Sequence, residues 1–198
     1  MSQFFDDRRK LSKTQHNLTH WQQGHTWIFV TWRLADSIPK SILLDWKRKQ
    51  DTFLKLHPKP WDDETAATHH RRFTMALETE LDQAHGSCCL TDHHQIVADA
   101  FHHFNGIRYH LDTFVVMPNH VHLLFHPFKD HTLPEIIHSL KSFTARQINK
   151  SLKQSGSLWQ ADYWDRLIRS QKHLEWTRKY IQKNPTNLKT GTYALYQR

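Results

Sequence analysis

Apolar residues recur at two spacings along the chain, and each spacing predicts one kind of element. Runs rich in β-branched and aromatic residues are typical of strands, and they occur at residues 26–34, 109–117 and 120–125. Apolar residues that recur every three or four positions are typical of helices, and they occur at residues 41–56, 61–85, 92–104, 132–152 and 170–184. Residues 1–24 follow neither spacing and are expected to be an irregular lead-in, and residues 186–198 are expected to be a tail.

Short motifs predict where some of these helices begin and end. Thr132-Leu133-Pro134-Glu135 has the form of a capping box with proline in the first turn, so a helix is expected to begin there. The apolar stripe of that helix includes Phe143 and Ile148. Asp92 is a candidate cap for the preceding helix, and Asn105-Gly106 is expected to turn the chain after it.

Pro118-Asn119 separates two predicted strands and is expected to join them as an antiparallel hairpin. Successive side chains of a strand point to opposite faces of the sheet. His120, His122 and Leu124 are therefore expected to share one face of the second strand, with Val121, Leu123 and Phe125 on the other.

Length and composition favour one globular domain over residues 1–198. A hydrophobic content of 38%, with eight Trp and eleven Phe, excludes a disordered or fibrous protein. No apolar run approaches the roughly 18 residues of a membrane span, and the first residues lack the order of a secretory signal, so a cytoplasmic location without a membrane partner is expected. Cys88 and Cys89 are neighbours, which disfavours a disulfide or a cysteine zinc site.

The net charge of +8 comes from the last third of the chain. Residues 1–130 carry 15 Lys and Arg against 15 Asp and Glu, whereas residues 131–198 carry 12 against 4. A local positive field favours a polyanionic partner, because binding releases the counterions condensed on phosphates. Nucleic acid is the first expectation and an anionic membrane surface the second, while a basic balance alone also serves solubility.

His120 and His122 are the first candidates for a metal site. Two imidazoles two residues apart on a strand project from the same face and can bind one divalent ion in neighbouring positions. The spacing alone is weak evidence, because the chain has one such pair and 18 His residues in 198 positions would give roughly one or two by chance. Taken alone, the pair is better interpreted as two half-exposed strand histidines.

Several ordered motifs change that interpretation. They are Phe29-Val30-Thr31-Trp32-Arg33-Leu34-Ala35-Asp36-Ser37, Phe114-Val115-Val116-Met117-Pro118-Asn119-His120-Val121-His122-Leu123-Leu124, Leu140-Lys141-Ser142-Phe143-Thr144, Trp159-Gln160-x-x-Tyr163-x-Asp165-Arg166 and Tyr180-Ile181-x-x-Asn184-Pro185. The set closely resembles the REP-associated tyrosine transposases, in the single-tyrosine branch of the HUH (His-hydrophobic-His) nucleases. The resemblance runs from about residue 26 to residue 185. It implies an α+β fold of HUH nuclease type, with a ferredoxin-like antiparallel sheet flanked by helices.

The resemblance also implies the roles of four residues. His120 and His122 match the metal-binding histidines of the family, and Tyr180 matches its nucleophilic tyrosine. The phenol would attack a phosphodiester and leave a 5′-phosphotyrosine, while Mg²⁺ or Mn²⁺ acts as a Lewis acid. Asn184 lies one helical turn after Tyr180, so its amide oxygen is a candidate third ligand, as the family places a similar residue there.

Other residues have less specific roles. Tyr163 is a rival nucleophile, ranked second because its stretch has no ligand on a helical turn. Four cations, namely Lys141, Arg146, Arg166 and Arg169, are candidate phosphate contacts, and Trp159 or Trp164 is a candidate platform for an unpaired base. Each also has an ordinary interpretation as surface or core, as do Tyr180 as a core residue and Asn184 as a helix end before Pro185.

The expected function is a metal-dependent endonuclease and strand transferase that acts on single-stranded DNA at or beside a hairpin. By resemblance, the hairpins are those of repetitive extragenic palindromes. Relatives include monomers and dimers with shared active sites, and the sequence leaves both open. The tail after Pro185 lacks the family's Lys-Ala-Gly-Leu continuation, so its part in DNA recognition is not assigned. The alternatives are a non-catalytic hairpin DNA- or RNA-binding protein of the same fold and a structural metal protein.

Overall fold

The computed structural model describes residues 3–15 and 19–198, and contacts divide the chain into two compact units. One unit comprises Met1–Ala35 and Cys89–Arg198, and the other comprises Asp36–Cys88. Two compact units can still fold together, so one domain over residues 1–198 stays a prediction.

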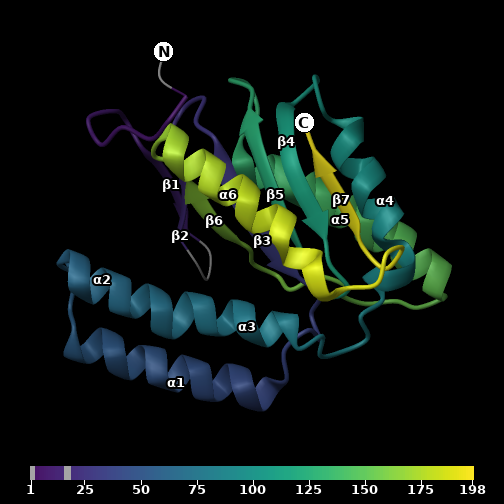
Figure 1. The fold of residues 1–198 in the computed structure, drawn as a ribbon, viewed down its shortest axis with the longest axis horizontal. Helices are drawn as coiled ribbons and strands as arrows, with labels where there is room; N and C mark the ends of the chain where they lie inside the picture. Colours follow the sequence, from purple (N-terminus) through teal and green to yellow (C-terminus); the bar gives the residue numbers. More distant parts are fainter. Residues whose placement is uncertain (1–2, 16–18) are drawn as a thin grey trace. The chain divides into compact units, whose positions relative to one another are not determined.

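The first unit is built on a five-stranded antiparallel sheet (Figure 1). Its strands are β3 (Ile28–Arg33), β4 (Tyr109–Val116), β5 (His120–Pro127), β6 (Trp164–Leu167) and β7 (Ala194–Gln197), in the spatial order β6-β3-β5-β4-β7. Between β3 and β4 the chain contains the second unit and then helix α4 (Leu90–His103), and α5 (Leu133–Leu152) connects β5 to β6. A β-α-β-β-α-β order with these strand neighbours is ferredoxin-like, so the predicted α+β fold class is confirmed.

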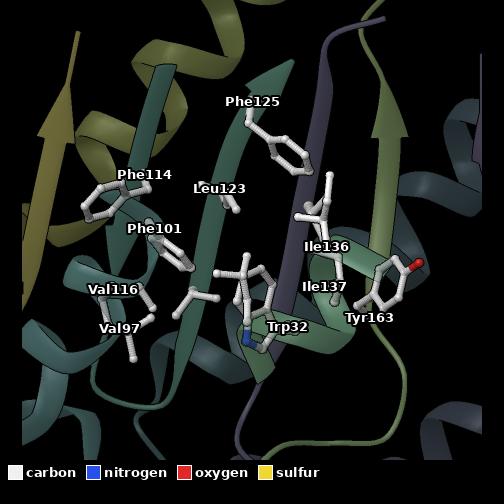
Figure 2. Packing of buried hydrophobic residues seen from close by; sticks show 14 of the residues in the cluster. Trp32, Val97, Phe101, Phe114, Val116, Leu123, Phe125, Ile136, Ile137 and Tyr163 are labelled. Carbon is white, nitrogen blue, oxygen red and sulfur yellow. The ribbon is translucent and has the colours of Figure 1, made fainter. Parts of the chain in front are cut away.

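Apolar side chains cover both faces of this sheet. Trp32, Phe101, Phe114 and Ile136 belong to the larger cluster, on the face that carries α4 and α5 (Figure 2). The smaller cluster lies on the other face, where Phe29, Val115 and Leu124 meet Leu174 and Ile181 of α6 (Gln171–Lys183). Figure 1 shows α6 crossing the sheet on the side opposite to α5. A 3₁₀ turn, Asn184–Asn187, follows α6 and contains Pro185.

Helix α5 begins with the predicted capping box. The backbone N–H of Glu135 donates to the Thr132 hydroxyl, and the Glu135 carboxylate accepts from the Thr132 N–H at 3.0 Å. The prediction that Phe143 is in the core is wrong, because this residue lies at the edge of the helical stripe and is 41% exposed. Buried Thr144 takes the central position and accepts a hydrogen bond from the Trp159 indole at 3.0 Å. Asp92 is not a cap either, because α4 already begins at Leu90.

The second unit is helical. It contains α1 (Lys40–Leu56), α2 (Asp63–His69), a π-helical segment (His70–Met75) and α3 (Ala76–Asp82). The segment from α2 to α3 is the helix predicted over residues 61–85, interrupted by the π-helical turn. Phe53 of α1 and Phe73 of the π-helical segment are buried at the centre of this unit. The Trp46 indole of α1 donates to the Phe73 carbonyl at 2.9 Å. Among the helices of the described residues, none is long and apolar enough to cross a membrane.

The two ends of the chain contain strands that the sequence pattern did not predict. Residues 1–24 include β1 (Ser12–Gln15) and β2 (Thr19–Gln22), which pair antiparallel, so the prediction of an irregular lead-in is wrong. The tail provides β7, which pairs with β4 and stacks Tyr196 on Phe114 at 5.5 Å between ring centroids. These short strands are defined by backbone pairing with a neighbour, and an apolar pattern does not report that pairing.

Candidate active site

The structure brings the four residues predicted for the metal and the nucleophile to one face of the sheet. His120 and His122 project from β5 toward α6, and their ring centroids are 4.8 Å apart. The Tyr180 ring, on α6, lies 5.3 Å from the His122 ring. Asn184 caps the C-terminus of the same helix, one turn after Tyr180. A β-hairpin and the last long helix therefore meet where the predicted chemistry requires them to meet.

Neighbouring polar groups hold one nitrogen of each imidazole. The Nδ1 atom of His120 lies 2.7 Å from the Asn119 side-chain oxygen, and the Nδ1 atom of His122 lies 2.7 Å from the Thr31 hydroxyl. A carbonyl oxygen only accepts, so Nδ1 of His120 carries the proton and Nε2 keeps its lone pair. Metal-binding histidines are commonly oriented in this way by a partner on the other ring nitrogen. Sequence reasoning missed Thr31 and Asn119, although both lie within the quoted motifs.

Burial keeps both imidazoles neutral. Each residue is 1% exposed, and desolvation lowers the pKa of His120 to about 3, although the Asn184 side chain acts in the opposite direction. The pKa of His122 is also lowered well below its ordinary value, first by burial and then by the neighbouring His120. A metal ion binds the deprotonated imidazole, so no proton has to be displaced at neutral pH.

The donor set fits a divalent ion only if Asn184 takes part. Within residues 3–15 and 19–198, no three His, Cys, Asp or Glu residues gather as a metal site. The Asn184 amide oxygen is buried beside His120, and it accepts no hydrogen bond of good geometry from the described residues. A carbonyl-type oxygen suits Mg²⁺ and Mn²⁺, and two imidazoles with one oxygen leave positions open for substrate oxygens.

Aromatic side chains fix the Tyr180 ring. The ring stacks on Trp176 of the same helix, with centroids 5.7 Å apart and planes inclined by 13°. It also meets Phe29 of β3 edge to face at 5.9 Å. Phe29 in turn stacks on the His122 ring at 5.5 Å, so one aromatic residue contacts both the nucleophile and a metal ligand.

An ion pair anchors α6 to the sheet two residues before Tyr180. Asp112 lies in a β-bulge of β4, between Leu111 and Thr113, and is 2% exposed. The Arg178 guanidinium donates from Nε to one carboxylate oxygen at 2.8 Å and from Nη2 to the other at 2.5 Å. The hydrogen bond from this guanidinium to Asp112 raises the pKa of Arg178. No local sequence pattern indicates this pair, because a bulge and a distant helix create it.

The four predicted phosphate contacts do not gather in one place. Arg166 lies over the Trp164 ring at 4.8 Å, on the face of the histidines, and Arg169 lies 5.6 Å from the Phe5 ring. Lys141 and Arg146 belong to α5, on the other face, and the Lys141 ammonium donates to the carbonyls of Gln160 and Ala161. Their roles in DNA binding stay predictions.

The rival nucleophile Tyr163 is on the wrong face for this site. It is 8% exposed and packs in the larger cluster with the side chains of α5. Burial raises the pKa of its phenol, which disfavours the phenolate. The geometry therefore favours Tyr180 over Tyr163.

Comparisons with known proteins match the chain to a sequence family and to solved structures. The sequence model of the family described as "Transposase IS200 like" matches residues 71–184. A solved REP-associated tyrosine transposase bound to a REP hairpin aligns over 92% of this chain and 73% of its own, with 14% identity and a TM-score of 0.40. A proposed transposase from Deinococcus radiodurans aligns over 82% and 93%, with 19% identity and a TM-score of 0.36. Neither structural likeness bears on function at these scores, and no curated protein matches the chain.

Proposed function

Because the chain belongs to the family of IS200-like transposases, we propose that it is a metal-dependent endonuclease and strand transferase for single-stranded DNA. The convergence of His120, His122 and Tyr180 on one sheet face is the observation that supports this activity most directly. The motifs shared with REP-associated tyrosine transposases make hairpin or repeat DNA the proposed target.

Tyr180 is the proposed nucleophile. Its phenolic oxygen bonds to the scissile phosphorus while the bond to the 3′ oxygen breaks, which leaves a 5′-phosphotyrosine and a free 3′-hydroxyl. A later attack by a 3′-hydroxyl reverses the step and joins two strands. Trp176 and Phe29 hold the phenol beside His122, so little freedom is lost when the phosphate arrives.

His120, His122 and Asn184 are the proposed ligands of the metal. A bound Mg²⁺ or Mn²⁺ ion supplies Lewis-acid polarisation of the scissile phosphate. Asn119 and Thr31 hold the imidazoles in the required orientation, and burial keeps them neutral. In this proposal the chain's own part is to present three ligands and a nucleophile on one face of the sheet.

A covalent adduct assay tests the proposal. A labelled DNA hairpin with single-stranded flanks is incubated with the protein and Mn²⁺, and the products are separated under denaturing conditions. We expect a protein–DNA adduct that is absent from Tyr180→Phe, absent after chelation of the metal, and retained in the matched control Tyr163→Phe. Equal retardation of the DNA by parent and Tyr180→Phe on a native gel, with no adduct from either under denaturing conditions, would instead indicate a binding protein.

A further inference from the structure

A pocket of about 440 Å³ lies between α5 and the loop that leads into β6. Ser142 and Ala145 line it from the helix, and Gly156, Ala161 and Asp162 line it from the loop. Tyr163 completes one wall, and Figure 2 shows its ring beside Ile137 with the hydroxyl pointing away from the packed cluster. Sites for small organic groups have this size, with apolar and aromatic walls and a few polar groups.

Two contacts tie the loop to helix α5 beside the pocket. The Lys141 ammonium donates to the carbonyls of Gln160 at 2.7 Å and Ala161 at 2.8 Å. On the other side of the loop, the Trp159 indole donates to the Thr144 hydroxyl at 3.0 Å. Walls that are fixed in this way bind a ligand with less loss of conformational freedom.

The chemistry of the pocket suits a nucleobase better than a phosphate. The ammonium of Lys141 already donates to backbone carbonyls, and the carboxylate of Asp162 repels an anion. One Asp162 oxygen accepts from the Tyr163 N–H at 3.0 Å. Carboxylates accept well from the exocyclic amino groups of bases. The Ser142 hydroxyl, which lies 3.5 Å from Nε2 of His138, also lines the pocket.

The pocket is close to the candidate active site around the edge of the sheet. Thr31 pairs with His122 on one side and with Trp164 of the edge strand β6 on the other. Trp164 contacts Phe29 on the histidine face, whereas the preceding Tyr163 packs on the pocket face. Two strand spacings of about 4.8 Å separate Trp164 from His122. A DNA strand bound at the active site would pass Trp164 if it continued around this edge toward the pocket.

We infer that this pocket binds one unpaired nucleobase of the DNA strand that is cut, and that it favours a base with an exocyclic amino group over thymine. The inference rests on the proposed function, because it takes the substrate from it. Base stacking in single-stranded complexes contributes about 1–3 kcal/mol per base. A value of about 1.4 kcal/mol, in the lower half of that range, corresponds to about tenfold in affinity.

The test is an abasic scan of the single-stranded flanks. Tyr180→Phe protein is titrated with fluorescent hairpin DNA in which one nucleotide at a time is abasic. We expect one position near the cut to lose affinity about tenfold, and a cytosine-to-thymine change there to weaken binding. Ser142→Leu, which fills the pocket, should bind the intact DNA about tenfold more weakly and be insensitive to the abasic nucleotide at that position.

Two controls make the result specific. Gln147→Leu places the same side chain on an exposed position of α5, away from the pocket, and should behave as the parent. Asp162→Asn should lose the preference for cytosine over thymine. An unchanged abasic profile in Ser142→Leu overturns the inference, as does the absence of any sensitive position. If the parent forms no covalent adduct but the abasic scan still shows a sensitive position, the result would contradict the proposed function alone.

Discussion

His120 and His122 are available as metal ligands because other side chains occupy their Nδ1 atoms. The Thr31 hydroxyl is 2.7 Å from His122, on the neighbouring strand and directly opposite in register. Removing such an outer contact commonly weakens metal binding 10- to 100-fold, as the ring can then rotate or change tautomer. We expect Thr31→Val to weaken Mn²⁺ binding by about that factor, measured by calorimetry, while the folded structure is kept. Thr31→Ser keeps the hydroxyl and should retain most of the affinity, and equal losses in the two variants would contradict this role.

Burial of His120 should also make stability depend on pH. Its pKa is about 3 in the folded chain against 6.5 ordinarily, so the unfolded chain takes up the proton first as the pH falls. The contribution of this residue to the free energy of unfolding should therefore decrease below pH 6.5, by about 1.4 kcal/mol per pH unit. We expect urea denaturation in the presence of chelator to show a shallower decline between pH 6.5 and 4.5 for His120→Gln than for the parent. Identical slopes would contradict the neutral state of the imidazole.

Helix α6 is the element on which the proposed chemistry depends, because it carries the nucleophile and a candidate ligand. Its rotation about its axis decides whether Tyr180 faces His122, and the Asp112–Arg178 ion pair fixes that rotation. Asp112 is buried but the Arg178 side chain is 32% exposed, so removing the arginine should cost up to the about 3–5 kcal/mol of a fully buried pair, whereas replacing both partners can be neutral. We expect Arg178→Met to destabilise the protein strongly and Asp112→Asn with Arg178→Met to recover stability in urea denaturation.

The rate of adduct formation separates positioning from stability. The double variant should stay folded and bind hairpin DNA with the affinity of the parent, yet form the Tyr180 adduct more slowly, because apolar packing does not fix the helix rotation. Arg178→Lys is the conservative comparison, because lysine keeps the charge but cannot donate to both carboxylate oxygens in the fork geometry of a guanidinium. A double variant that forms the adduct at the parent rate would show that packing alone positions Tyr180.

At the scale of the whole molecule, local periodicity predicted the parts of the sheet whose side chains alternate between two apolar layers. These parts are β3, β4 and β5. The same alternation predicted that His120 and His122 lie on one face. The convergence with Tyr180 came from the motif resemblance, since no local pattern places a helix over a hairpin. β6 and β7 have four residues each and are fixed by pairing with strands distant in sequence, and the Asp112 bulge depends on the same long-range register.

The contribution of β7 to the sheet can be measured at its alternating side chains. Tyr196 stacks on Phe114 against the larger apolar cluster, whereas Leu195 is 42% exposed on the other side of the same strand. Truncation of a half-buried aromatic residue removes part of the about 3–5 kcal/mol that a fully buried one contributes, so Tyr196→Ala should lower the free energy of unfolding by about 1–3 kcal/mol. Leu195→Ala should change it by less than about 0.5 kcal/mol.

Because β7 covers the edge of β4, Tyr196→Ala should also self-associate more readily, as an uncovered edge strand pairs with other chains. Urea denaturation and size-exclusion chromatography measure the two effects, and equal stability of the two variants would show that β7 adds little to the fold.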